Sequence, residues 1–277
     1  MKATIRALFF IAGLLSLSAC SLLPEEVDET KGWSAQKFYE EASFAMSEGD
    51  YDTAIKYYEG LEARYPFGRF AMQAQLDVAY AYYKDAQPES SIAAAERFIK
   101  LHPRNPYVAY AYYLKGLVNF NRNISFITRF VPTDQSQRDP GSTLDSFNDF
   151  AELVRRFPDS EYAEDARKRM TYLRNNLAMH EVHVARYYLD RGAYLASANR
   201  CVTVIEKYQR TPAIREALVT MIEAYDALGM QQLAGDARRV LALNEGAGNF
   251  ALPELDQEAG EKTLIRRAWE YMELDEN

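Results

Sequence analysis

The chain has 277 residues, a formal net charge of −8 and 48% hydrophobic residues. This hydrophobic fraction is that of a folded globular protein and not of a disordered chain. The acidic balance argues against sequence-independent binding of nucleic acid, which requires a basic surface. We therefore expect a folded protein that does not have nucleic acid as a partner.

The first twenty residues have the layout of a lipoprotein signal peptide. Lys2 and Arg6 precede an apolar stretch that ends in Leu17-Ser18-Ala19-Cys20. The stretch is too short to span a bilayer comfortably, and small residues before the cysteine are typical of a cleavage site. We predict that residues 1–19 are removed and that Cys20 carries lipid, palmitate included. An ordinary secretory signal or a short transmembrane anchor is the alternative.

The segment after the cysteine is short and acidic, and we interpret residues 20–32 as a flexible tether between lipid and fold. Nothing after residue 20 is long and apolar enough to span a membrane, so the lipid is the expected anchor. Lipidation would leave Cys201 as the remaining cysteine. It lies in a helical pattern, and we expect it to be a buried, inert thiol.

A short motif recurs along the chain: an apolar residue is followed four positions later by an aromatic residue or His. The four copies are Leu61/Tyr65, Phe98/His102, Leu153/Phe157 and Val204/Tyr208, and proline follows the first three. This spacing is one helical turn followed by a stop. Small residues then recur where a second helix would approach closely. Pro66 and Pro103 are 37 residues apart, and paired helices at such a period are typical of tetratricopeptide repeats.

The distances from Pro103 to Pro158 and from Pro158 to Gln209 are longer than this period. Residues 160–190 contain no Gly or Pro, so the excess there predicts one elongated helix. The other excess falls on residues 121–142, a polar run with three helix breakers, which we interpret as an inserted loop. A last pair is expected at about 211–228 and 230–243, turning at Gly229. The predicted fold is all-α, a tetratricopeptide-repeat superhelix of about five helix pairs over residues 33–245.

Residues 246–277 form an acidic C-terminal extension with a predicted helix at 257–273. Five apolar residues share one face of that helix: Leu264, Ile265, Ala268, Trp269 and Met272. We expect this face to dock on the last repeat, because the end of a stack of repeats needs a cap. Docking on a partner is the alternative.

The sequence offers no pattern that argues for catalysis. It contains no Gly-rich phosphate loop, no nucleophile elbow and no Cys-His arrangement. His180 and His183 could share a helix face, but two ligands do not make a zinc site. His102 takes the place that Tyr65 and Phe157 hold in sister repeats, so we interpret it as structural. We expect no enzymatic activity, no metal and no cofactor.

Besides the lipidation motif and the repeats, two short sequence strings make the chain similar to a known protein family. Arg64-Tyr65-Pro66-Phe67-Gly68 ends one repeat, and Asp134 leads into Arg138-Asp139-Pro140 within the inserted loop. The chain resembles the BamD (ComL) family of lipoproteins of the outer-membrane β-barrel assembly machinery, over about residues 17–243. The resemblance implies a lipid-anchored protein on the periplasmic face of the cell outer membrane. It also implies binding to the POTRA domains of BamA, to BamC-like and BamE-like lipoproteins, and to unfolded outer-membrane proteins awaiting folding and membrane insertion.

The resemblance also suggests site residues. Arg200 would lie on the half that faces BamA, and Tyr65 on the half that receives substrate. Unfolded barrel segments end in aromatic residues, and aromatic side chains offer them flat, amphipathic surfaces. We therefore predict a substrate groove that includes Phe38, Tyr39, Tyr65, Phe67 and Tyr80.

Two other functions remain open from the sequence. A tetratricopeptide pilot lipoprotein for pilus or secretin assembly would share the lipidation motif and the repeats, but should lack the Arg138-Asp139-Pro140 loop. A cell-wall hydrolase would need a pair of carboxylates in a cleft, and the sequence does not place such a pair.

Overall fold

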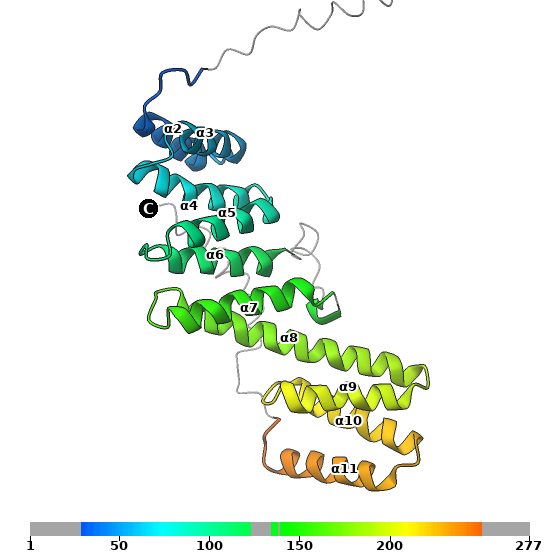
Figure 1. The fold of residues 1–277 in the computed structure, drawn as a ribbon. Coiled ribbons are helices and arrows are strands. Elements are labelled where there is room, and N and C mark those ends of the chain that lie inside the picture. The colour runs from blue at the N-terminus through cyan, green and yellow to red at the C-terminus, as the bar shows by residue number, and fades with distance from the viewer. Residues whose placement is uncertain (1–28, 123–133, 138, 251–277) are drawn as a thin grey trace, which may run out of the picture. The chain divides into compact units, whose positions relative to one another are not determined.

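The computed structural model describes residues 29–122, 134–137 and 139–250 (Figure 1). The predicted signal peptide, Cys20, most of the tether and the predicted helix at 257–273 lie outside these residues. The described residues belong to two compact units, one ending at Ala74 and the other starting at Gln75. Each unit is described by itself below.

The described part of the chain is helical and contains no strand. Its first unit holds α2 (Ala35–Ser47), α3 (Tyr51–Arg64) and the start of α4 (Arg69–Lys84). The remaining elements are α5 (Pro88–Leu101), α6 (Val108–Asn121), the short 3₁₀ helix η3 (Gln135–Gln137), α7 (Gly141–Arg156), α8 (Ala163–Asp190), α9 (Tyr194–Lys207), α10 (Ala213–Ala227) and α11 (Gln231–Gly246). In the described ranges the α-helices form five successive pairs along the chain, which confirms the predicted all-α class of tetratricopeptide-like helix pairs.

The recurring sequence motif ends the second helix of each of the first four pairs. In every copy the backbone N–H of the aromatic residue or His donates to the carbonyl of the apolar residue four positions earlier. The N···O distances are 2.8 Å for Tyr65 to Leu61, 2.9 Å for His102 to Phe98, 2.8 Å for Phe157 to Leu153 and 2.9 Å for Tyr208 to Val204. The apolar members are at most 1% exposed. One turn thus closes the helix and anchors it in the core, as the spacing predicts.

The turns inside the pairs use a second device. The second residue after the first helix of such a pair has a positive φ, and two consecutive N–H groups reach back to the helix, as in a Schellman motif. Such residues are Gly49, Ala86, Gly192 and Gly229 in the pairs α2–α3, α4–α5, α8–α9 and α10–α11. The predicted turn at Gly229 is confirmed, with a φ of 70°. In the pair α6–α7, most of the connecting segment lies outside the described residues.

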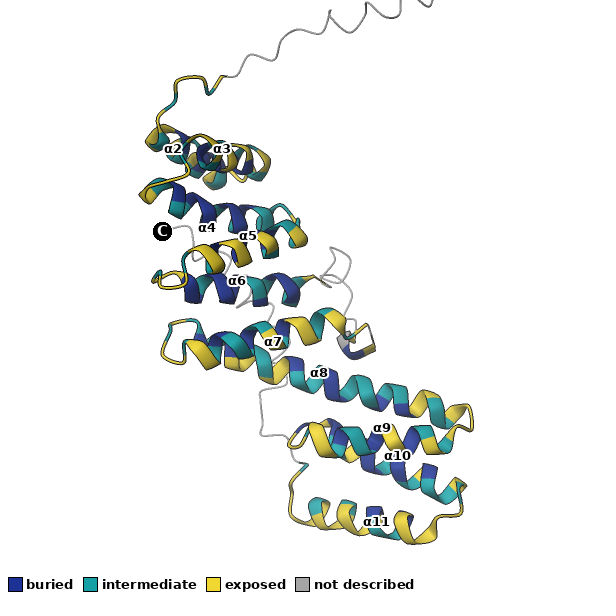
Figure 2. Cartoon of the chain, in the orientation of Figure 1, coloured by how far each residue is buried: buried dark blue, intermediate teal, exposed yellow. Residues whose placement is uncertain are grey.

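Small residues allow the helices to pack closely. Ala111, Ala166 and Ala217, near the starts of helices, are completely buried, and Ile214 is half-buried against its neighbours. In the second unit one cluster joins four helices through Ala178, Val182, Ala185, Cys201, Val204, Ala213, Ala217, Met221 and Ala237. Figure 2 shows helices with both buried and exposed residues, as expected for amphipathic helices. Helix α6 differs, because its buried residues lie all around the helix.

The elongated helix is confirmed. Helix α8 runs for 28 residues, about 42 Å at 1.5 Å per residue. The inserted loop predicted at 121–142 is described only in part. Within it, α6 ends at Asn121, η3 occupies Gln135–Gln137 and α7 begins at Gly141.

Candidate functional site

Two residues at the C-terminal end of α3 bind the segment that precedes α2. Arg64 Nη1 donates to the carbonyl of Thr30 at 2.6 Å, and Arg64 Nη2 lies 3.3 Å from the hydroxyl of the same residue. The Tyr65 hydroxyl donates to the carbonyl of Trp33 at 2.7 Å. Sequence reasoning missed this contact, although the Arg-Tyr-Pro string marks its position. We call Arg64 and Tyr65 the clasp.

Phe38 belongs to the core and not to a groove. Its side chain is 1% exposed, and its ring lies 5.2 Å from that of Trp33 and 6.5 Å from that of Tyr65, centroid to centroid. The guanidinium of Arg64 covers the ring at 5.0 Å. The prediction that Phe38 lines the substrate groove is therefore wrong in this conformation, because Phe38 shares the buried face of α2 with Ala42.

Phe67 is the most open of the predicted groove residues. It follows the clasp in the turn between α3 and α4, and 90% of it is exposed. Tyr39 is half-buried between the rings of Tyr58 and Phe70, at 5.9 and 5.6 Å. The ring of Tyr65 is half-buried too, and its hydroxyl is used by the clasp. In the first unit, Phe67 thus presents its whole ring to solvent.

Tyr80 lies on α4 in the second unit. It is half-buried, its ring centroid is 6.1 Å from that of Tyr83, and Lys84 Nζ approaches the ring to 5.8 Å. A common groove for the other predicted residues, Tyr39, Tyr65, Phe67 and Tyr80, stays a prediction.

Arg200 lies on α9 with its side chain 44% exposed. Its Nη1 donates to Glu181 Oε2 on α8 at 3.0 Å. This hydrogen bond raises the pKa of Arg200 further above its ordinary value. The guanidinium is therefore charged, held in one direction, and still accessible to a partner.

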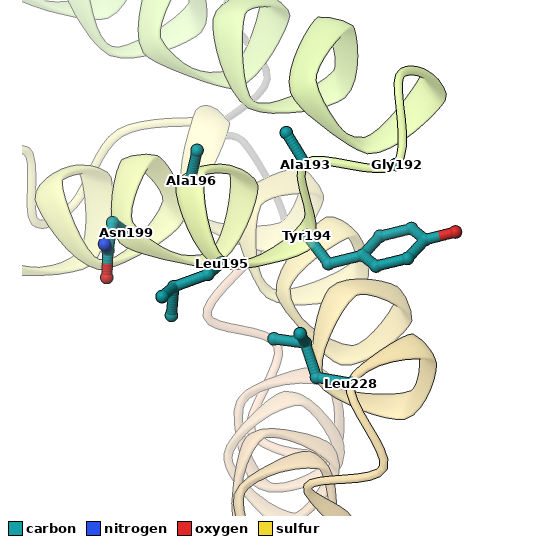
Figure 3. A pocket seen from close by; sticks show the side chains of 7 residues that line it. All are labelled: Gly192, Ala193, Tyr194, Leu195, Ala196, Asn199 and Leu228. Atoms are coloured by element: carbon teal, nitrogen blue, oxygen red, sulfur yellow. The ribbon is translucent and has the colours of Figure 1, made fainter.

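An open hollow lies at the start of α9 (Figure 3). Leu195 comes from the first turn of α9 and is 57% exposed, and Leu228 comes from the end of α10. The full lining is Gly192, Ala193, Tyr194, Leu195, Ala196, Asn199 and Leu228. Asn199, which lines the hollow, directly precedes Arg200 on α9. Sequence reasoning singled out the Asn199-Arg200 pair but not this hollow, because Leu228 is distant in sequence.

The two histidines on α8 hold the described part of the inserted loop. His180 Nδ1 lies 2.9 Å from the carbonyl oxygen of Ser136. His183 Nε2 lies 2.9 Å from the Ser136 hydroxyl and 3.2 Å from Asp134 Oδ2. Burial opposes ionisation of Asp134, but hydrogen bonds from Ser136 hold the pKa of its carboxyl below the usual value. Both histidines therefore have a structural task that the sequence did not reveal.

The described ranges contain no group of three or more His, Cys, Asp or Glu side chains placed to hold a metal ion. None of the helices in these ranges combines the length and the apolarity needed to cross a bilayer. Cys201 is completely buried, as predicted, and burial raises the pKa of its thiol to about 12. His102 has a structural position, with Nε2 at 2.8 Å from Gln75 Oε1 and its ring against Phe98.

Comparisons with known proteins identify relatives of this chain. One, from Neisseria meningitidis serogroup A (strain DSM 15465 / Z2491), is named outer membrane protein assembly factor BamD. It is 47% identical over 233 residues, which cover 83% of this chain and 87% of the relative. A protein of the same name from Vibrio cholerae serotype O1 (strain ATCC 39315 / El Tor Inaba N16961) is 36% identical over 84% of this chain and 97% of its own length.

Among solved structures, the crystal structure of MamA protein matches 80% of this chain and 97% of that chain, at 15% identity and a TM-score of 0.33. That likeness is too weak to carry an argument. The YfiO family, described as outer membrane lipoprotein, matches residues 32–241. This match covers the helix pairs from the segment held by the clasp almost to the end of α11. The chain therefore belongs to the YfiO family of outer membrane lipoproteins.

Proposed function

We propose that the protein is an assembly factor for outer-membrane proteins and works as a scaffold. The observation that carries the proposal is the 47% identity, over 83% of this chain, to a protein named as such a factor. Stacked helix pairs offer extended surfaces to other chains, which suits a binding task better than a catalytic one. The relatives favour this function over that of a pilot protein for a pilus or secretin.

The expected partners follow from the resemblance and from the exposed residues. BamA would bind through its POTRA domains at α9, which carries Arg200 and whose first turn lines the hollow with Leu195. Unfolded outer-membrane proteins would contact the first unit at Phe67, whose exposed ring suits an aromatic chain end. BamC-like and BamE-like lipoproteins would complete the complex. The exposure of Arg200 and Phe67 supports the first two contacts.

The anchor would be lipid on Cys20, at the periplasmic face of the outer membrane. The sequence of the first twenty residues and the family support this anchor. Acyl chains contribute about 0.8 kcal/mol per buried CH₂, and stable anchoring takes more than one membrane-binding signal. Palmitate together with further acyl chains on Cys20 would meet this requirement.

The proposal is tested by purifying the native protein from detergent-solubilised outer membranes and identifying its partners by mass spectrometry. We expect a stoichiometric barrel protein with POTRA domains, together with smaller lipoproteins. A secretin or a pilus component in place of that barrel would support the pilot function instead. Cys20→Ser is the control for the anchor, since this variant should leave the membrane fraction while its folded part is unchanged.

A further inference from the structure

Helix α11 is the last described helix, and one of its flanks is apolar and exposed. Its inner face is buried through Ala234 and Ala237. Beside that face, Leu233 and Val240 are each 44% exposed and Leu243 is 72% exposed. These residues recur at intervals of seven and three, so they lie along one side of the helix. We call Leu233, Val240 and Leu243 the α11 stripe.

A stack of helix pairs normally covers such a flank. Each pair packs on the next, and the terminal unit needs a cap with a polar outer face. The α11 stripe is apolar, as are the helix surfaces that a neighbouring helix covers in such a stack.

The end of α11 turns in the same way as the ends of the helices that have a partner. Gly248 has a φ of 68°, its N–H donates to the Glu245 carbonyl at 3.1 Å, and the Asn249 N–H donates to the Asn244 carbonyl at 2.9 Å. The turn at Gly229 between α10 and α11 has the same two bonds, from Gly229 to Asp226 and from Met230 to Tyr225. There the turn leads into an antiparallel helix. The turn after α11 therefore has the backbone conformation that elsewhere in this chain leads into an antiparallel helix.

The sequence that follows suits the stripe in length and in pattern. Helix α11 has 16 residues, or about 24 Å, and a helix over residues 257–273 would be about 25 Å long. Its apolar face would present Leu264, Ile265, Ala268, Trp269 and Met272. The ten residues 247–256 would link the two helices. A short linker of this kind gives the attached segment an effective concentration on the order of millimolar, which favours it over a second copy or a free partner.

We propose that residues 257–273 form an amphipathic helix that packs on the α11 stripe and caps the last helix pair. The helix covers Leu233, Val240 and Leu243 and turns its acidic and basic residues to solvent. The extension is thus the end of the folded domain and not a free tail.

Hydrogen exchange of the full mature protein, followed by mass spectrometry, tests the proposal without any substitution. Amides of residues 262–272 should exchange about tenfold or more slowly than in an unstructured chain. Leu243→Asp should abolish that protection while the amides of α8 and α9 stay protected. Leu144→Asp is the matched control, because Leu144 is 48% exposed on α7, far from the stripe in sequence, and it should leave residues 262–272 protected.

Exchange of residues 262–272 at the rate of an unstructured chain in the native protein would overturn the proposal. Protection that appears only at concentrations where sedimentation shows a dimer would assign the stripe to a second copy instead. A second readout uses Trp269, one of only two tryptophans in the chain. In a Trp33→Phe variant its emission should be that of a buried indole, and Leu243→Asp should shift it to the red. Emission of a solvated indole in Trp33→Phe would count against the cap.

Discussion

The ring of Phe150 occupies the space in which Gly116 would carry a side chain. A Cβ added at Gly116 would lie 2.5 Å from Phe150 Cε1, which is far inside van der Waals contact. Phe150 is completely buried, so α6 and α7 meet closely only because residue 116 has no side chain. The nearby Ser146 hydroxyl donates to the Gly116 carbonyl at 2.9 Å, which holds the two helices in this position.

Gly116→Ala should therefore destabilise the protein by about 1–3 kcal/mol through overpacking. Chemical denaturation followed by circular dichroism measures the change. Gly235→Ala is the matched control, because Gly235 lies within α11 and its added Cβ would meet no atom within 4 Å. That control should be neutral or stabilising by up to about 1 kcal/mol. Equal effects of the two substitutions would contradict the packing argument.

The clasp predicts an effect of the Tyr65 hydroxyl alone. Tyr65→Phe keeps the ring but removes the hydrogen bond to the Trp33 carbonyl, at an expected cost of about 1 kcal/mol. The backbone amides of residues 30–34 should then exchange hydrogen with solvent faster than in the unsubstituted protein. Tyr107→Phe is the control, since Tyr107 is 54% exposed and its change should leave stability as it was. Unchanged exchange in Tyr65→Phe would show that the hydroxyl does not hold this segment.

Arg200→Glu tests the proposed docking surface for BamA. Reversing the charge should reduce the affinity for a POTRA-bearing barrel at least about tenfold. Stability should change by at most about 1 kcal/mol, because exposed ion pairs contribute little. Arg186→Glu is the control, as Arg186 pairs with Glu216 and its side chain is 48% exposed. Undiminished binding by Arg200→Glu, or loss of its helicity, would refute the docking assignment.

Phe67→Ala tests the proposed contact with substrate. A lost aromatic contact of about 1 kcal/mol should weaken binding of a peptide with an aromatic C-terminal end roughly fivefold. Fluorescence anisotropy of a labelled peptide gives the affinity. Phe44→Ala provides the comparison, because Phe44 is also strongly exposed, at 64%, among the described residues of the first unit. If both variants bound the peptide equally well, the contact would lie elsewhere.

The buried thiol of Cys201 predicts that the stability of the fold depends on pH. Burial raises the pKa of Cys201 to about 12 in the folded protein, above the ordinary thiol value of 9.0, so folding favours the neutral thiol. The resulting stability is complete below about pH 9 and is lost as the pH rises towards 12. In a chain without Cys20, a thiol reagent at pH 8 should therefore react with Cys201 only after urea is added. Rapid reaction of Cys201 without urea would show that the thiol becomes exposed to solvent in the native protein.

Local patterns were enough to predict much of the helical framework. The spacing of Leu61 and Tyr65 predicts a helix end because both residues lie within one turn, and the bond between them is local. The long α8 follows from a run without Gly or Pro, since nothing in that run interrupts helical hydrogen bonding. The resemblance to the BamD family likewise came from strings of adjacent residues.

The tertiary structure alone decided which of these residues are accessible. Phe38 and Phe67 are both aromatic residues of the first repeat, yet one is 1% and the other 90% exposed. Helix periodicity can predict an apolar face, but only packed neighbours decide how completely a given ring is covered. Contacts between distant residues, such as Arg64 with Thr30 or His183 with Asp134, leave no periodic trace in the sequence. The chain thus determined its helices through local spacing, whereas the packing of one helix on another decided its surfaces.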